Sequence, residues 1–301
     1  LLLHVNEVNA RALELIEVAK KDYGLRPEHD VTLATAILHD VDKPILYRNN
    51  GNGTFTDVAR QQLPHTAWFT MGADCGDLNN DGLIDFLVAD MAGTTHYKSK
   101  TTMAIMGSST WFMQNADPPQ YMRNCLYLNT RTGRFLDTAF YSGLAYSDWT
   151  WAVKTGDLDC DGLLDVFFSN GITRSFNDSD NPLDLKKLHG KTEWDLYENT
   201  PPRPEKNLAF RNLGGMKFEK TGETWGLGKM GMSYGTAWFD LEGDGDLDLA
   251  VVATRNVVIL VNDGGGGRQL AFSAASYPNS SEAQPPHTLG VGDVDGDSDV
   301  D

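Results

Sequence analysis

The chain lacks the features that mark several common classes of protein. It has only three cysteines, Cys75, Cys125 and Cys160, and they form no CxxC pair, which argues against a disulfide framework and a zinc site. No apolar run approaches the roughly 20 residues of a membrane-spanning helix. The first residues, LLLHVNEVNARAL, lack the basic segment of a signal peptide and an initiator methionine, so we expect a fragment of a longer protein. A nucleophile elbow, a phosphate-binding loop and an HExxH motif are also missing.

Positive charge is scarce as well. The 301 residues include 25 Lys+Arg and 42 Asp+Glu, which gives a formal net charge of -17. This balance argues against nucleic acids and anionic membrane surfaces as partners. The excess is local, because 17 of the acids fall in four nine-residue windows and the other 25 equal the number of basic residues. The windows, which we interpret as specialised loops, are 77–85, 157–165, 240–248 and 293–301.

A hairpin-like segment precedes each acidic window. Each segment has an apolar run that ends at Asn, a turn that contains Gly, and a second apolar run, which is a hairpin pattern. The four are PILYRNNGNGTFTDVA (44–59), CLYLNTRTGRFLDTA (125–139), LAFRNLGGMKFEKTG (208–222) and VILVNDGGGGRQLAFSAA (258–275). Phe55, Phe135 and Phe218 each stand 22 residues before the first acid of the next window. The pattern predicts units of four short strands with the acids between the first two strands.

Such repetition predicts an all-β fold, a β-propeller of four-stranded blades. About four clear blades are expected, as part of a seven-bladed ring, in the cassettes 44–91, 124–170, 207–254 and 257–301. Inserts over 91–123 and 171–206 separate the second strand from the third. Residues 1–43 are either a degenerate blade or a helical N-terminal segment, and both interpretations stay open. A β-sandwich is the alternative architecture, but it does not require a near-identical repeat.

The windows share the pattern D-x-[DNE]-x-D-[GS]-x-x-D, which is typical of a cation-binding turn. Oxygens at positions 1, 3 and 5 converge, Gly at position 6 permits the turn, the carbonyl at position 7 can point inward, and the acid at position 9 closes the shell. Hard oxygen donors without His or Cys favour Ca²⁺. The ligands predicted for up to four structural Ca²⁺ sites are Asp77, Asn79, Asp81, Leu83, Asp85, Asp157, Asp159, Asp161, Leu163, Asp165, Asp240, Glu242, Asp244, Asp246, Asp248, Asp293, Asp295, Asp297, Asp299 and Asp301.

The windows differ in expected strength, and two other interpretations compete with calcium. Loop 157–165 should bind most tightly, and loop 293–301 most weakly, because Ser298 replaces the turn glycine. An EF-hand would need an acid at position 12, where Val88, Phe168 and Val251 stand. Acidic turns without an ion are the simpler alternative. Four windows in register with a repeated hairpin favour Ca²⁺ over that alternative.

With these loops the chain resembles the FG-GAP/VCBS repeats, as in the propeller of integrin α subunits, over about 44–301. The segments DPPQYMRNCLYLN, TRSFNDSD, TEWDLYENTPPRPEKNLAFRN and GMSYGTAWFDLEGDGDLDLAVV more narrowly resemble the bacterial ASPIC/UnbV-associated group, which is related to cartilage acidic protein. The resemblance implies a propeller, usually of seven blades, with calcium in its loops and an extracellular or cell-envelope setting. Ser298, and the end of the chain at position 9 of the last window, depart from the pattern.

The inserts and the connections between blades are where we expect a partner to bind, because loops on a rigid scaffold carry function. In an up-and-down blade they lie on the rim opposite the acidic turns. The candidates there are His65, His96, Tyr97, Lys98, Tyr146 and Trp194. Acids such as Asp178, Glu193 and Asp195 would be the catalytic candidates if the inserts formed a glycosidase-like site.

We therefore predict a calcium-binding extracellular β-propeller that is a non-catalytic adhesion module for a protein or glycan ligand. A polysaccharide lyase or hydrolase on the same fold is the alternative. An extracellular, periplasmic or cell-surface location is expected, because millimolar external Ca²⁺ fills loops of modest affinity. No nucleic acid partner and no membrane span are expected.

Overall fold

The computed structural model describes residues 34–36, 45–102, 116–175, 178, 180, 200–253, 256–262 and 272–278, and all structural statements refer to these. Three predictions therefore lie mainly or wholly outside it. These are the interpretation of residues 1–43, apart from one short strand, the acidic window 293–301, and the middle of the second insert with Trp194, Glu193 and Asp195.

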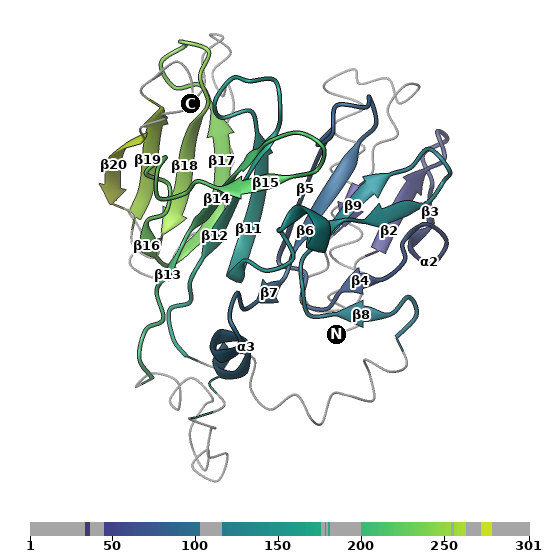
Figure 1. The fold of residues 1–301 in the computed structure, drawn as a ribbon, viewed down its shortest axis with the longest axis horizontal. Helices are drawn as coiled ribbons and strands as arrows, with labels where there is room; N and C mark the ends of the chain where they lie inside the picture. Colours follow the sequence, from purple (N-terminus) through teal and green to yellow (C-terminus); the bar gives the residue numbers. More distant parts are fainter. Residues whose placement is uncertain are drawn as a thin grey trace.

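Four antiparallel sheets follow one another along the chain (Figure 1). The first contains β1 (Ala34–Ala36), β2 (Ile45–Asn49) and β3 (Phe55–Asp57). The second contains β5 (Gly72–Gly76), β6 (Asp85–Ala89), β9 (Cys125–Asn129) and β10 (Phe135–Asp137). The third contains β11 (Asp148–Gly156), β12 (Asp165–Asn170), β14 (Leu208–Asn212) and β15 (Phe218–Lys220), with β7 (Met91–Ala92) added beside β11. The fourth contains β17 (Ser233–Phe239), β18 (Asp248–Ala253), β19 (Asn256–Asn262) and β20 (Phe272–Pro278).

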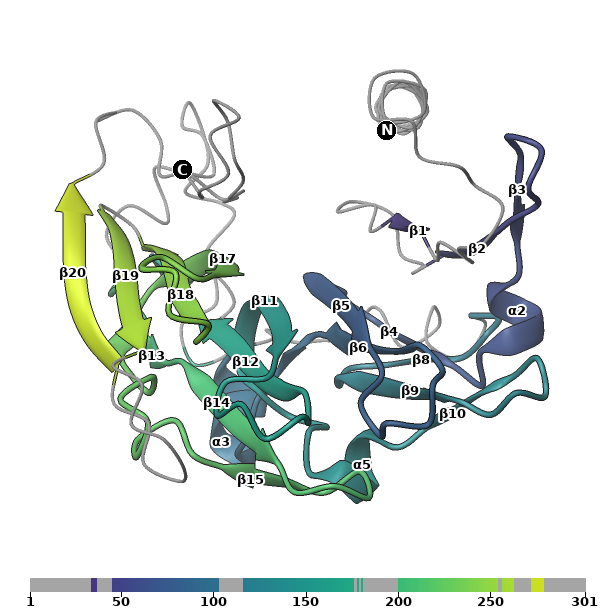
Figure 2. The same cartoon turned by 90° about the horizontal axis from the view of Figure 1, so that it is seen from above.

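The sheets are arranged as blades around an arc (Figure 2). In the last three blades, β5, β11 and β17 are first in chain order and lie on the inner side of the arc, whereas the fourth strands β10, β15 and β20 lie on the outer side. This arrangement confirms the predicted all-β, propeller-type fold.

Each sequence cassette is divided between two blades. Windows 77–85, 157–165 and 240–248 join the first and second strands of a blade, and the hairpin that follows supplies the third and fourth strands of that same blade. The inserts join the second and third strands. The acidic turns therefore share a rim with the hairpin turns, and we call it the acidic rim. The other rim, which carries the inserts and the connections between blades, is the insert rim.

Short elements cover the insert rim (Figure 1). The first insert forms the helix α3 (His96–Thr102), and β8 (Gln120–Tyr121) pairs in parallel with β4 (Thr66–Ala67). The second insert ends in β13 (Glu205–Lys206), which pairs with β16 (Met230–Gly231). Two further four-residue helices, α2 (Ala59–Gln62) and α5 (Ala139–Ser142), follow β3 and β10, the last strands of the first and second sheets. Among the described helices, none has the length and apolar character needed to cross a bilayer.

The hydrophobic core lies between neighbouring blades. Leu78, at position 2 of its window, packs in one cluster with Phe210 and Met216 of the next blade. Leu158, at the same position one blade later, packs with Leu249 and Trp225. The inner strands approach closely, because a Cβ on Gly72 would stand 3.0 Å from the Cα of Ala152. A side chain there would push β5 away from β11.

Buried polar contacts also join the blades at the insert rim. The Asn124 side chain accepts a hydrogen bond from the N–H of Asp90 (2.8 Å) and donates one to the Ser147 hydroxyl of the next blade (2.8 Å). Asn207 makes the same pair of contacts with Asn170 and Ser233. These contacts tie the end of a second strand to the start of the following blade.

Asp90 is a fully buried acid among these polar groups. One oxygen of its carboxyl group accepts the backbone N–H groups of Trp68 (2.8 Å) and Phe69 (3.0 Å), and the other has no hydrogen-bond partner. Burial raises the pKa of Asp90 to about 7, although the backbone hydrogen bonds oppose the shift. The folded chain therefore holds a proton here at pH values where the unfolded chain does not.

This shift predicts a specific pH dependence of stability. Because the folded pKa is raised, the stabilising contribution is complete at low pH and is lost as the pH rises toward 7. Asp90→Asn mimics the protonated acid and should gain melting temperature relative to the wild type between pH 5 and pH 8. Other titrating groups are present in both proteins, so their effects cancel in the difference between the two melting temperatures. A difference that stays constant over the range, measured by calorimetry, would show that Asp90 ionises normally.

Candidate metal-binding loops

The three described acidic windows fold into the same turn. Position numbers count from Asp77, Asp157 and Asp240. In loop 157–165 the position 1 carboxylate accepts the N–H groups of Asp161 (3.0 Å) and Gly162 (2.8 Å). Loops 77–85 and 240–248 repeat both contacts. The position 6 glycines have φ values of 81°, 85° and 92°, a conformation that side chains disfavour.

The acid at position 9 connects the turn to the third strand of the blade. Asp165 accepts the N–H of Leu158 in the loop (3.0 Å) and the N–H of Asn212 at the end of β14 (2.8 Å). The equivalent acids Asp85 and Asp248 make the same two contacts in their own blades. All three side chains are fully buried or nearly so. Position 9 therefore holds the blade together in addition to facing the turn.

The oxygen atoms of loop 157–165 fit a divalent cation. Ligand oxygens of Asp157, Asp159 and Asp165 lie within 4.8 Å of one another. Calcium binds oxygens at about 2.3–2.6 Å, so two ligands on opposite sides of the ion stand about 5 Å apart. Both carboxylate oxygens of Asp159 are buried; Oδ2 forms an ion pair with Arg211 (2.5 Å), and Oδ1 has no hydrogen-bond partner. The donor set is therefore compatible with Ca²⁺ in chemistry and in spacing.

Burial raises the free energy of the ionised form of these acids when no cation faces them. It raises the pKa of Asp165 to about 7 and that of Asp85 to about 6, in both cases against the effect of their two backbone hydrogen bonds. The pKa of Asp159 is also raised, by burial and then by the charge of Asp161. A bound cation would favour the ionised forms and remove this cost.

Arg211 partly neutralises loop 157–165, which the sequence pattern did not reveal. It stands on β14, one residue before the end of the strand, and its Nε lies 2.5 Å from Asp159 Oδ2. A second nitrogen of the guanidinium lies 2.8 Å from Asp161 Oδ2. The same repeat position is Leu128 in the preceding blade and Val261 in the following one. Arg211 therefore makes this loop electrostatically different from its neighbours.

At the insert rim the predicted residue Lys98 lies in a buried charge cluster. Its Nζ is 2.5 Å from Asp148 Oδ2 and 3.6 Å from Glu205 Oε1. Arg203, from the second insert, lies 3.5 Å from the same Glu205 oxygen. The cluster joins both inserts to the start of β11, because Glu205 also accepts the N–H of Trp149. His96 and Tyr97, beside Lys98 on α3, are exposed.

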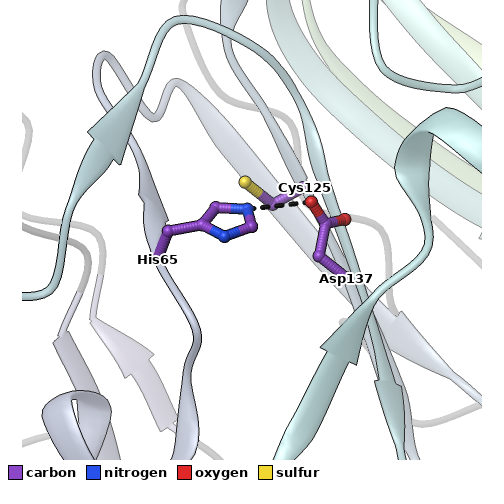
Figure 3. Close-up of side chains that lie close together, drawn as sticks. All are labelled: His65, Cys125 and Asp137. Atoms are coloured by element: carbon purple, nitrogen blue, oxygen red, sulfur yellow. Dashed lines mark hydrogen bonds and ion pairs between the residues drawn. The ribbon is translucent and has the colours of Figure 1, made fainter.

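His65 lies in a second cluster, together with Asp137 and Cys125 (Figure 3). His65 Nε2 is 2.8 Å from Asp137 Oδ2, and Arg123 contacts both of these residues, at 2.8 and 2.5 Å. Burial raises the pKa of the Cys125 thiol to about 12, so its sulfur is a poor metal ligand. Burial also favours the neutral form of Asp137, but hydrogen bonds from His65, Ala139 and Arg123 lower its pKa overall. Arg123 supplies the cation of this cluster.

Exposed aromatic side chains gather around Arg123. The guanidinium lies 4.7 Å from the ring centre of Phe140 and 5.8 Å from that of Tyr121, and Phe140 contacts Tyr146 edge to face at 5.8 Å. The exposed fractions of Phe140, Tyr121 and Tyr146 are 63%, 49% and 43%. We call these three residues the aromatic patch. Tyr146 was among the predicted residues, whereas Tyr121 and Phe140 were missed because a lone aromatic residue in a connection carries no sequence signal.

One comparison, with known protein families, agrees with the repeat pattern. The FG-GAP-like repeat matches the chain at residues 30–88 and 240–301. No curated protein matches. A solved structure that concerns specific recognition of non-reducing terminal N-acetylglucosamine by a lectin of Agrocybe aegerita is similar over 79% of this chain, with 16% identity and a TM-score of 0.36. The match spans 47% of that lectin chain.

Arg211 gives a direct test of the loop electrostatics. If loop 157–165 binds calcium as expected, the guanidinium competes with the ion for Asp159 and Asp161. Arg211→Ala should then strengthen calcium binding at this loop by about fivefold, equivalent to roughly 1 kcal/mol. It should lower the melting temperature more in chelator than in calcium. Arg48→Ala, the same repeat position in the first sheet, is the matched control for calorimetric titration. Weaker calcium binding by Arg211→Ala would show that the arginine holds the acids in place instead.

Proposed function

We propose that this chain, an array of FG-GAP-like repeats in a propeller-type fold, is a calcium-stabilised, non-catalytic module that binds a protein or glycan partner outside the cytoplasm. The acidic rim supplies stability and the insert rim supplies the binding surface. The observation that carries the division is that the well-exposed aromatic residues of the described chain lie in the inserts and in the connections between blades.

The structural role of calcium is supported by the repeated loop geometry. Three successive loops present carboxylates at positions 1, 5 and 9 in the same arrangement, next to blade-to-blade contacts. Asp77, Asp157 and Asp240 would supply ligands from position 1, and Asp85, Asp165 and Asp248 from position 9. A bound Ca²⁺ supplies positive charge that offsets the repulsion among these acids. Because the position 9 acids also fix the third strands, the ion would stabilise whole blades.

The binding role of the insert rim is supported by its exposed aromatic side chains. In the described part of the chain, all large aromatic residues that are well exposed lie in inserts or in connections between blades, and these are Tyr97, Tyr121, Phe140, Tyr141 and Tyr146. Tyrosine, phenylalanine and arginine dominate the energetic centres of protein interfaces, and aromatic faces also stack on sugar rings. The aromatic patch around Arg123 is therefore our candidate for the centre of the binding surface.

A binding role also agrees with how three described acids of the insert rim are paired. Asp148 and Glu205 are covered by Lys98 and Arg203, and Asp137 by Arg123. Carboxylates held in such ion pairs are poorly suited to exchange protons with a substrate. The enzyme alternative has no specific support among these residues.

Calcium dependence also favours a location where the ion is abundant. Loops with three to five carboxylates and exposed edges bind Ca²⁺ with modest affinity, so they are filled where the ion is at millimolar concentration. We therefore propose an extracellular, periplasmic or cell-surface setting.

The aromatic patch can be tested by single substitutions. The labelled chain is applied, in calcium, to arrays of glycans and of secreted and cell-surface proteins, and the Kd of each ligand found is measured. Phe140→Ala and Tyr146→Ala should each weaken that binding by about tenfold or more, the cost of losing one central aromatic side chain.

Leu213→Ala is the matched control, because Leu213 is 54% exposed but lies in a hairpin turn on the acidic rim. It should leave the Kd unchanged. Ligand binding that is lost in Leu213→Ala and retained in both patch variants would place the binding surface on the acidic rim and contradict the proposal. Turnover of an arrayed glycan would replace the binding proposal with the enzyme alternative.

A further inference from the structure

The acidic loops of neighbouring blades contact one another along their rim. Asn80, at position 4 of loop 77–85, donates a hydrogen bond from its side chain to the Gly162 carbonyl of the next loop (2.9 Å). Cys160, at position 4 of that loop, lies 3.2 Å from the Asp246 carboxylate of the third loop. The three loops are therefore adjacent in space, although about 80 residues separate each from the next along the chain.

Asn212 makes the most extensive of these connections. Its backbone N–H holds the position 9 acid Asp165 of its own blade (2.8 Å). Its side-chain amide donates to the carbonyl of Leu164 in its own loop (3.0 Å) and to the carbonyl of Leu78 in the preceding loop (2.9 Å). Its side-chain oxygen accepts the N–H of Gly214, which fixes the hairpin turn. One fully buried residue thus connects two acidic loops.

Asn262 repeats this arrangement one blade later. Its backbone N–H donates to the Asp248 carboxylate (2.8 Å), and its side-chain amide donates to the Leu158 carbonyl of the preceding loop (3.1 Å). Asn129, at the same position in the earlier blade, contacts its own loop, through the Ile84 carbonyl (3.3 Å) and the Asp85 carboxylate (2.8 Å). Among the described residues, Asn212 and Asn262 therefore bridge two acidic loops each, whereas the contacts of Asn129 are with one acidic loop.

We infer that Asn212 is a positioning residue that couples cation binding between loops 77–85 and 157–165, and that Asn262 does the same for loops 157–165 and 240–248. The inference rests on the proposed calcium role of the loops. A cation in loop 157–165 orders Asp165, and Asp165 orders Asn212. Asn212 then holds the Leu78 carbonyl, directly after the position 1 ligand Asp77. Filling one loop thus lowers the cost of ordering the next, which gives positive cooperativity.

The coupling can be measured with a separate reporter for each loop. The position 6 amides of Gly82 and Gly162 donate to the position 1 acids of their own loops, so their NMR signals follow occupancy loop by loop. Ca²⁺ is titrated into the ¹⁵N-labelled chain. Asp161→Ala, which disables loop 157–165, should raise the calcium midpoint of Gly82 by about fivefold or more. Asn212→Ala should raise the midpoints of both glycines.

Asn129→Ala is the comparison variant: among the described acidic loops its side chain contacts loop 77–85 alone, so it should raise the Gly162 midpoint less than Asn212→Ala does. If Asn212→Ala does not fold, the Asp161→Ala titration decides the question alone. A Gly82 midpoint that is the same in the wild type and in Asp161→Ala would overturn the coupling while leaving calcium binding in place. Glycine signals that do not respond to calcium at all would instead overturn the proposed calcium role together with this inference.

Discussion

The buried aspartate at position 9 of each acidic loop is the interaction on which the rest of this structure depends. Asp85, Asp165 and Asp248 each accept one N–H from the turn and one from the end of the third strand. A buried carboxylate is costly unless it is hydrogen-bonded or faces a cation. Two hydrogen bonds meet part of that cost, and the raised pKa values of Asp85 and Asp165 show that part remains. A calcium ion on the open side of the turn would meet the rest.

This constraint separates the two rims. On the acidic rim, backbone amides and Arg211 hold carboxylates, and the side chains of Asn212 and Asn262 hold backbone carbonyls, so we propose a structural role for this rim. On the insert rim, the charged groups are paired internally in the clusters of Lys98 and His65, and aromatic rings face the solvent. A rigid scaffold on one side and exposed aromatic side chains on the other is the arrangement expected of a binding module.

The sequence pattern predicted the blade topology well, because strand periodicity and turn chemistry are local. The 22-residue spacing and the glycine at position 6 were sufficient to place the windows between the first and second strands. Contacts between blades could not be predicted in the same way. Arg211, Asn212 and Phe140 act on partners about 50, about 130 and 17 residues away, and only folding reveals these pairs. The recurrent Asn at the end of each hairpin's first strand was visible, but its bridging role depends on blade packing. His65 and Lys98 were expected at a binding surface, and the structure places His65 against Asp137 and Arg123 and pairs Lys98 with Asp148.

The central claim is that these loops hold calcium and that calcium holds the blades. Crystals grown in millimolar calcium, with diffraction data collected at a long wavelength where calcium scatters anomalously, test it most directly. The account predicts anomalous peaks inside loops 77–85, 157–165 and 240–248, each with carboxylate oxygens at about 2.3–2.6 Å. Well-ordered loops with the same hydrogen bonds and no anomalous peak would contradict it, and would show that the acids are stabilised by the backbone and Arg211 alone.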